Sequence, residues 1–368
     1  MKILYVTTIS NTMTFFVEHI KMLMKEGHTV DLACSSALKP VNPVYKEIGC
    51  NIYDIPFSRS PLSRKNLTAY RMLKHLIETG HYDIVHTHTP NASMLTRLAC
   101  RKVRKQGTKV FYTAHGFHFF KGAPIKNWLL FYPVEKICAK YTDVLITINK
   151  EDYALAQKKM HASKVYYVPG VGVDLQKIRE IQSNRDEMRS SMGVPKDCIL
   201  LLSIGELNCN KNHQIVVRAL ANLKNSNVHY AVAGVGNQHD ELLKLAKSLG
   251  VGDRFHLLGY RTDALKLYKA ADVFVFPSFR EGLSVSMMEA MACGLPIVCS
   301  EIRGNVDLVQ NGKGGFYFKP DNLNAVQEVL EKITESPDLR KEFGLWNGAA
   351  IENFGIKNVL ANMKDILL

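Results

Sequence analysis

The stretch Asp272–Pro296, DVFVFPSFREGLSVSMMEAMACGLP, joins a short apolar run to a helical pattern through a polar loop. The run Asp272–Phe276 is typical of a buried strand, and a helix is predicted to start near Gly282–Ser284. In open parallel sheets, ligands bind in the loops just beyond the carboxyl ends of the strands. This stretch therefore predicts an α/β fold with a ligand site in the loop that carries Glu281.

The same order of strand and helix repeats on both sides of this stretch. Val- and Ile-rich runs are predicted as strands at 3–8, 29–33, 52–55, 84–86, 110–113, 144–147, 165–168, 199–204, 228–233, 254–257, 273–276, 297–299 and 315–318. Amphipathic segments lie between them, among them a charged helix predicted at 175–191, and this alternation favours parallel sheets with helices on both faces. The order restarts after the Pro- and Gly-rich stretch 169–173, so two doubly wound Rossmann-like domains facing across a cleft are expected.

Length and composition agree with two globular domains. The chain has 368 residues, of which 46% are hydrophobic and 22% charged, and this balance excludes a disordered protein. We expect one domain over 1–170, a second over 171–345, and a C-terminal helical segment over 346–368 that crosses back to the first. No apolar run approaches the roughly 18 residues of a transmembrane helix, and the opening MKILYVTTIS is predicted as a strand and not as a signal peptide.

The cysteines indicate the redox compartment. All eight are scattered singly, without a C-x-x-C pair. This pattern disfavours a disulfide framework or a zinc ribbon, so a reducing, cytoplasmic location is expected.

The net charge of +13 is concentrated in the first half of the chain. Residues 1–174 contain 24 Lys and Arg against 12 Asp and Glu, whereas residues 175–368 contain 23 against 22. This asymmetry favours an anionic partner for the first half: nucleic acid, an acidic membrane surface or a phosphorylated substrate. General solubility is the alternative explanation.

Two glutamates flank the helix start in the opening stretch. Glu281 lies just before the helix, and Glu289 lies two turns inside it. The free backbone N–H groups of a helix start near Gly282, Leu283 and Ser284 favour a phosphate. Carboxylates suit sugar or ribose hydroxyls, so the loop is interpreted as a site for a phosphate flanked by polyols. A surface helix with two ordinary glutamates is the alternative.

With these motifs, the sequence resembles the retaining GT-B-fold glycosyltransferases of family 4, of the type found in bacterial surface-polysaccharide pathways. Glu281 and Glu289 match the E-x7-E motif of that family, and the VPGVGVD linker at 168–174 also fits. The resemblance covers nearly the whole chain. It implies retention of anomeric configuration, an acceptor-binding first domain and a nucleotide-sugar-binding second domain. It places Glu281 beside the donor sugar hydroxyls and Glu289 on the ribose.

The resemblance also implies a diphosphate grip in the loop after the first strand of the second domain. The family usually has Gly-Arg-Leu there and a lysine five residues after the arginine; here Gly205 and Lys211 match, but Glu206 replaces the arginine. An arginine–phosphate contact contributes roughly 1.5–3 kcal/mol. Glu206 is therefore expected to turn away, or to hold Lys211 or a sugar hydroxyl. Arg261 or Arg303 is expected to supply the missing cation, and a merely solvated Lys211 is the alternative.

Histidines follow two neighbouring predicted strands, at His86, His88, His115 and His118. Zinc is a weak interpretation, because no cysteine or carboxylate accompanies them. The resemblance implies that His115 is the histidine of a T-x-H element near the reacting sugar, where it contacts the donor or steadies developing charge. For the other three, a packed or solvated histidine is the alternative.

Cations and aromatic residues mix at 58–74 and 117–132. Such segments can rest on an anionic bilayer, so we expect peripheral contact with the inner face of the plasma membrane. A buried helix with a solvated face is the alternative.

The chain contains no D-x-D pair, so a donor diphosphate is expected to bind without a metal or other cofactor. The predicted function is that of a retaining hexosyltransferase. It moves a sugar from a nucleotide sugar, a UDP-sugar, to a lipid-linked or oligosaccharide acceptor in capsule or exopolysaccharide biosynthesis. A GT-B-fold nucleotide-sugar epimerase or phosphorylase is the alternative enzyme. A basic membrane- or nucleic-acid-binding module is the alternative from another class, although no nucleic-acid motif is present.

Overall fold

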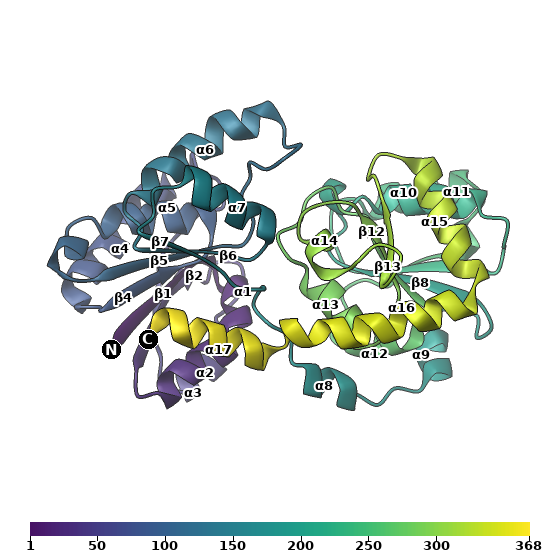
Figure 1. Cartoon of the computed structure of the whole chain (residues 1–368), viewed down its shortest axis with the longest axis horizontal. Coiled ribbons are helices and arrows are strands. Elements are labelled where there is room, and N and C mark those ends of the chain that lie inside the picture. The colour runs from purple at the N-terminus through teal and green to yellow at the C-terminus, as the bar shows by residue number, and fades with distance from the viewer. The chain divides into compact units, whose positions relative to one another are not determined.

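The computed structural model describes all 368 residues and contains two compact units. Unit 1 comprises Met1–Val171 and Lys357–Leu368, and unit 2 comprises Gly172–Ile356. Each unit is built around one parallel sheet with helices on both faces, which confirms the predicted α/β class and its two Rossmann-like sheets (Figure 1). No helix of the chain combines the length and the apolar character that crossing a bilayer requires.

The elements of unit 1 are β1 (Lys2–Ile9), α1 (Ser10–Met13), η1 (Thr14–Phe16), α2 (Val17–Lys25), β2 (Thr29–Ser35), α3 (Val44–Glu47), β3 (Asn51–Asp54), α4 (Lys65–Gly80), β4 (Ile84–Thr87), α5 (Pro90–Ala99), η2 (Val103–Gln106), β5 (Lys109–Ala114), α6 (Ile125–Ala139), β6 (Val144–Thr147), α7 (Lys150–Lys159), β7 (Lys164–Tyr167) and α17 (Ile356–Leu367). Those of unit 2 are α8 (Leu175–Glu180), α9 (Arg185–Ser191), β8 (Ile199–Ile204), η3 (Cys209–Lys211), α10 (His213–Asn222), β9 (Val228–Ala233), α11 (His239–Ser248), η4 (Gly252–Arg254), β10 (Phe255–Leu257), α12 (Ala264–Ala270), β11 (Val273–Phe276), α13 (Val285–Ala292), β12 (Ile297–Ser300), α14 (Asn305–Leu308), β13 (Gly315–Phe318), α15 (Leu323–Glu335), α16 (Pro337–Ala350) and η5 (Ile351–Phe354).

The sheet of unit 1 has the strand order β3-β2-β1-β4-β5-β6-β7. Its strands are apolar on both sides because successive side chains enter different cores: Ile3 and Tyr5 pack on one face, Leu4 and Val6 on the other. Helices α2 and α17 cover the first face, and α4 and α5 cover the second (Figure 1).

The last helix, α17, packs on unit 1. Val359, Met363 and Leu367 repeat every four residues, so they form one stripe, and this stripe is buried in the core beside α2. An ion pair of 2.7 Å between Lys364 Nζ and Glu26 Oε1 joins the exposed sides of the two helices. The last segment of the chain therefore belongs to the same compact unit as its first strand.

The sheet of unit 2 has the strand order β10-β9-β8-β11-β12-β13. One face is covered by α9, α12 and α13, and the other by α10, α11 and α15. The prediction of a single charged helix at 175–191 is wrong, because the structure has two helices, α8 and α9, with a break between them. The side chain of Asn184 accepts hydrogen bonds from the Asp186 and Glu187 N–H groups and so begins a new helix there.

The strand orders place a topological switch point in each sheet. In unit 2 it lies between β8 and β11, and in unit 1 between β1 and β4, because the connections run in opposite directions from these neighbouring strands. Ligands of open α/β sheets bind at the carboxyl ends of such strand pairs. The loops after β8 and β11 are therefore the first place to look for a site in unit 2.

Candidate functional site

The loops after β8 and β11 are held together by hydrogen bonds. The backbone N–H of Phe279 donates to the Asn210 carbonyl at 2.8 Å, and the side-chain amide of Asn210 donates to the Arg280 carbonyl at 3.0 Å. These bonds fix the two loops against each other, so side chains from both meet at the switch point. No sequence pattern indicated this role of Asn210.

An ion pair joins the two loops. Lys211 Nζ lies 2.8 Å from Glu281 Oε1, and both side chains are largely buried, with 19% and 16% of their surfaces exposed. The ammonium also lies 4.5 Å from the centre of the Phe276 ring. Two residues that the sequence analysis singled out in separate motifs are thus in direct contact.

The local backbone explains how Lys211 reaches this place. The Asn208 side chain accepts a hydrogen bond from the Lys211 N–H at 3.0 Å and so begins the short helix η3. The lysine side chain then runs across Gly205, where an added Cβ would lie only 3.2 Å from Lys211 Cε. Asn212 follows in the left-handed region, with a φ of 52°, and turns the chain into α10.

Helix α13 starts beside the ion pair. Ser284 is its N-cap residue, and the hydroxyl accepts a hydrogen bond from the Met287 N–H at 3.3 Å. Gly304, with a φ of 79°, packs against this loop, because an added Cβ would lie 2.0 Å from the Gly282 carbonyl oxygen. The remaining N–H groups of the first turn have no partner within the helix. They form a positive helix end next to Lys211.

Glu289 lies inside α13 and is mostly covered. It accepts a hydrogen bond of 3.0 Å from the hydroxyl of Tyr268, on α12. Burial raises the pKa of the Glu289 carboxyl, and the Tyr268 bond and Lys177 oppose this effect. Tyr268 was not found by sequence reasoning, because it lies 21 positions away on another helix.

The three other charged residues considered at this site have partners of their own or are buried. Glu206 is exposed and accepts a hydrogen bond of 2.8 Å from the Asn208 side chain, so the carboxylate that holds Lys211 is Glu281. Arg261 makes two bonds of 2.7 Å to Asp263, which raise the pKa of its guanidinium. Arg303 is buried in the loop after β12.

In unit 1, three of the four predicted histidines cluster at the carboxyl ends of β4 and β5. His86 Nε2 lies 2.8 Å from the Thr113 hydroxyl, and His115 Nε2 lies 3.4 Å from His88 Nδ1. His118 packs separately, against Phe131. No group of three or more His, Cys, Asp or Glu side chains in the chain is arranged to hold a metal ion.

Burial keeps these imidazoles neutral. It lowers the pKa of His86 to about 3 and that of His115 to about 4, and it lowers the pKa of His88 well below its usual value. His19, on α2, joins the cluster and has its pKa lowered to about 4, mainly by burial and further by His115. The carboxyl edge of this sheet therefore offers uncharged hydrogen-bonding groups at neutral pH.

Comparisons with known proteins cover the whole chain. Residues 14–177 match the model of "Glycosyltransferase Family 4", and residues 184–345 match that of "Glycosyl transferases group 1". EpsD of Bacillus subtilis (strain 168), which carries the name of a glycosyltransferase, is 36% identical over 99% of this chain and 96% of its own length. A UDP-Gal:alpha-D-GlcNAc-diphosphoundecaprenol alpha-1,3-galactosyltransferase of Escherichia coli is 26% identical over 96% of this chain and 92% of its own.

Solved structures show the same fold. A sucrose-phosphate synthase from Thermosynechococcus elongatus superposes with a TM-score of 0.82 at 18% identity, over 100% of this chain and 98% of that one. Anabaena HepE in complex with UDP and glucose superposes with a TM-score of 0.82 at 19% identity, over 100% and 99%. At these identities, the solved structures show the GT-B fold alone. The family models and the EpsD match show that the chain is a glycosyltransferase and belongs to family 4.

Proposed function

We propose that this glycosyltransferase moves a hexose from a UDP-sugar to a lipid-linked saccharide during surface-polysaccharide assembly, with retention of anomeric configuration. The observation that carries the proposal is the contact between Lys211 and Glu281 beside the start of α13. It brings a cation, a helix N-terminus and a hydroxyl-binding carboxylate together at the switch point of unit 2. A nucleotide sugar carries a diphosphate, which suits the cation and the helix N-terminus, and hydroxyls, which suit the carboxylate.

The ion pair leaves capacity for a ligand. An ammonium group has three donors, and one of them is used on Glu281, so the others can reach a diphosphate. The N–H groups at Gly282, Leu283 and Ser284 supply further donors to phosphate oxygens. In this assignment a metal ion is not needed, because lysine and helix end together offset the phosphate charge.

The two glutamates have different roles in this proposal. Glu281 accepts from hydroxyls of the donor sugar with the oxygen that Lys211 does not occupy. Glu289 accepts from the ribose hydroxyls, and the Tyr268 bond fixes the orientation of its carboxylate. Gly205 lets the lysine side chain lie close to the backbone. Glu206 and Arg261 are assigned to the donor as well, and His115 is assigned as a neutral hydrogen-bonding group for a sugar hydroxyl.

Relatives support the donor and acceptor classes. The Escherichia coli relative is named for UDP-Gal and a diphosphoundecaprenol acceptor. A Campylobacter jejuni relative, 33% identical over 39% of this chain, is named for an N-acetylgalactosaminyl transfer to a diphospho-undecaprenol saccharide. Both of these relatives are named for glycosyl transfer, which does not support an epimerase.

Helix α6 supports contact with the membrane. Ile125, Leu129 and Leu130 are 78%, 71% and 64% exposed, and Lys126 and Lys136 lie on the same helix. An apolar surface flanked by cations suits the boundary of an anionic bilayer. We place the enzyme on the inner face of the plasma membrane, where a lipid-linked acceptor is within reach.

A nucleotide panel tests the proposed donor class. We expect UDP to raise the melting temperature of the protein above the effect of GDP and ADP, since a ligand that binds only the folded state stabilises it. A UDP-sugar assay with and without a lipid-linked acceptor then identifies the reaction. Transfer that requires the acceptor supports the proposal, and a change of the sugar in its absence contradicts it.

A further inference from the structure

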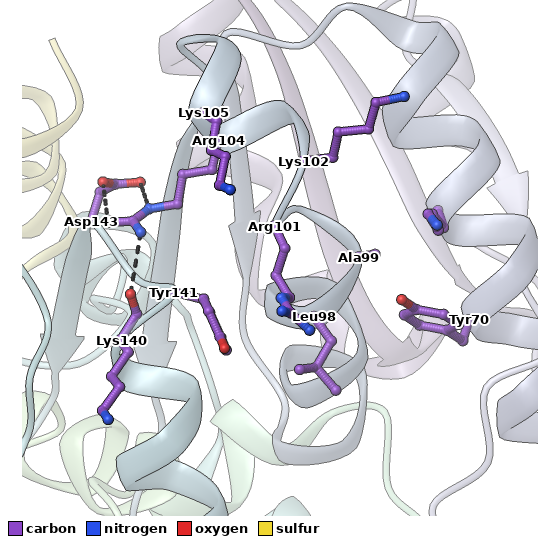
Figure 2. A pocket seen from close by; sticks show the side chains of 11 residues that line it. Tyr70, Leu98, Ala99, Arg101, Lys102, Arg104, Lys105, Lys140, Tyr141 and Asp143 are labelled. Carbon is purple, nitrogen blue, oxygen red and sulfur yellow. Dashed lines mark hydrogen bonds and ion pairs between the residues drawn. The ribbon is translucent and has the colours of Figure 1, made fainter.

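A pocket of about 770 Å³ lies in unit 1 (Figure 2). Three segments line it. Tyr70 and Lys74 come from α4, six residues between positions 98 and 105 come from the end of α5 and the turn after it, and three residues between positions 140 and 143 come from the connection of α6 to β6. The turn includes the basic sequence RKVRK at 101–105.

The pocket is on the opposite edge of the sheet from the histidine cluster. Asp143 directly precedes β6, and the basic turn precedes β5, so both lie at the amino ends of strands. His115 follows the carboxyl end of β5. Six residues of β5 separate the two edges, a length of roughly 20 Å. The pocket is therefore separate from the histidine cluster.

Six Lys and Arg residues line the pocket against a single carboxylate, that of Asp143. Arg104 makes two hydrogen bonds to this carboxylate, at 3.0 and 2.9 Å, and so ties the turn to the start of β6 (Figure 2). In unit 2, buried Arg189 makes a similar contact with Asp272 at the start of β11. Arg104 is thus explained by a structural role, because its ion pair with Asp143 holds the turn against the sheet.

Four of the cations have no carboxylate partner: Lys74, Arg101, Lys105 and Lys140. The guanidinium of Arg101 lies 5.0 Å from the centre of the Tyr141 ring, which holds it at the wall of the pocket. Like charges that line one concave surface repel each other, and a bound anion relieves this repulsion. Lysine and arginine donors are well suited to phosphate oxygens.

We propose that this pocket binds a phosphate-bearing anion, at a site distinct from the donor site. The phosphates can belong to a soluble molecule or to the headgroup of an anionic lipid. Both sources present the same chemistry to the pocket, and the proposal does not depend on the donor or the acceptor of the enzyme.

The test removes three of the unpaired cations in the variant Lys74→Gln/Lys105→Gln/Lys140→Gln. The matched control, Lys25→Gln/Lys46→Gln/Lys158→Gln, removes the same charge from exposed lysines of unit 1 outside the pocket. Inorganic pyrophosphate, followed by calorimetry, probes a soluble ligand at about 0.15 M salt. Phosphatidylcholine vesicles with and without phosphatidylglycerol, followed by co-sedimentation, probe a lipid. A shared Lys211→Ala background weakens pyrophosphate binding at the proposed donor site equally in both variants.

We expect the pocket variant to bind at least one probe about tenfold more weakly than the control, because several charge-assisted contacts are lost. Weakening with pyrophosphate identifies a soluble ligand, and weakening only with phosphatidylglycerol vesicles identifies a lipid headgroup. If the pocket variant and the control bind both probes equally, the proposal is wrong.

Discussion

Units 1 and 2 have the same kind of sheet but opposite chemistry at their switch points. Unit 1 presents His86, His88 and His115, all kept neutral by burial. Unit 2 presents a charged pair, Lys211 and Glu281, next to a helix end. The comparison shows that one architecture can present neutral imidazoles in one unit and a charged pair in the other, depending on the few residues after two strands.

The acid stability of the two units sharpens this comparison most strongly. The histidines of unit 1 bind fewer protons when folded than when unfolded between about pH 4 and 6.5, so the free energy of unfolding falls as the pH is lowered through this window. One pKa unit corresponds to about 1.4 kcal/mol, so the lowered pKa values of the cluster are expected to reduce the free energy of unfolding by several kcal/mol across this window. In unit 2, His213 and His256 also have their pKa values lowered to about 4, but they lie in separate places.

The two tryptophans allow each unit to be followed alone, because Trp128 lies in unit 1 and Trp346 in unit 2. Urea unfolding of Trp346→Phe and Trp128→Phe, at about pH 7.5 and pH 5, measures the two losses. We expect the free energy of unfolding reported by Trp128 to fall more than that reported by Trp346. The fall reported by Trp128 should become smaller after His86→Gln. Equal losses in both units would break the comparison.

Removing Lys211 is expected to have the next largest effect. Lys211→Ala should lower kcat/KM by roughly 10- to 100-fold, since a hydrogen bond to a charged group contributes about 1.5–3 kcal/mol. Steady-state kinetics with a UDP-sugar and acceptor measure this. Lys247→Ala, at an exposed position on α11, is the control and should be unchanged. Activity of Lys211→Ala at the level of Lys247→Ala contradicts the assignment.

The two glutamates of α13 and its loop should respond differently. Glu289→Gln is expected to weaken UDP binding by about tenfold, because a carboxylate accepts from ribose hydroxyls better than an amide does. Glu281→Gln should change UDP affinity less and turnover more, because UDP lacks the sugar that Glu281 is proposed to contact. Calorimetry with UDP and turnover with the full donor separate the two effects, and an identical pattern in both variants would remove the assigned roles.

The smallest expected effect concerns α6. Leu129→Ser/Leu130→Ser should weaken binding to phosphatidylglycerol vesicles by a few-fold, since part of the apolar contact with the bilayer is lost. Leu243→Ser/Leu345→Ser, at exposed positions of unit 2, is the control. Equal vesicle binding by the two variants speaks against membrane contact through α6.

The sequence predicted the sheets well because buried parallel strands are continuous apolar runs, as in Ile199–Ile204 and Val273–Phe276. The helix break at Asn184 was missed, because a charged segment that contains an N-cap residue in its middle resembles one continuous helix. The motifs located Lys211 and Glu281, but their mutual contact depends on Asn210 and on strand order. That information is spread over 70 positions.

Hydrogen–deuterium exchange with and without UDP tests the central claim most directly, the claim that unit 2 holds the donor between the loops after β8 and β11. We predict slower exchange in 203–213 and 277–292, where the backbone N–H groups of the helix start contact phosphate. The basic pocket of unit 1 should remain unchanged. Protection confined to segments outside these two loops would contradict the account.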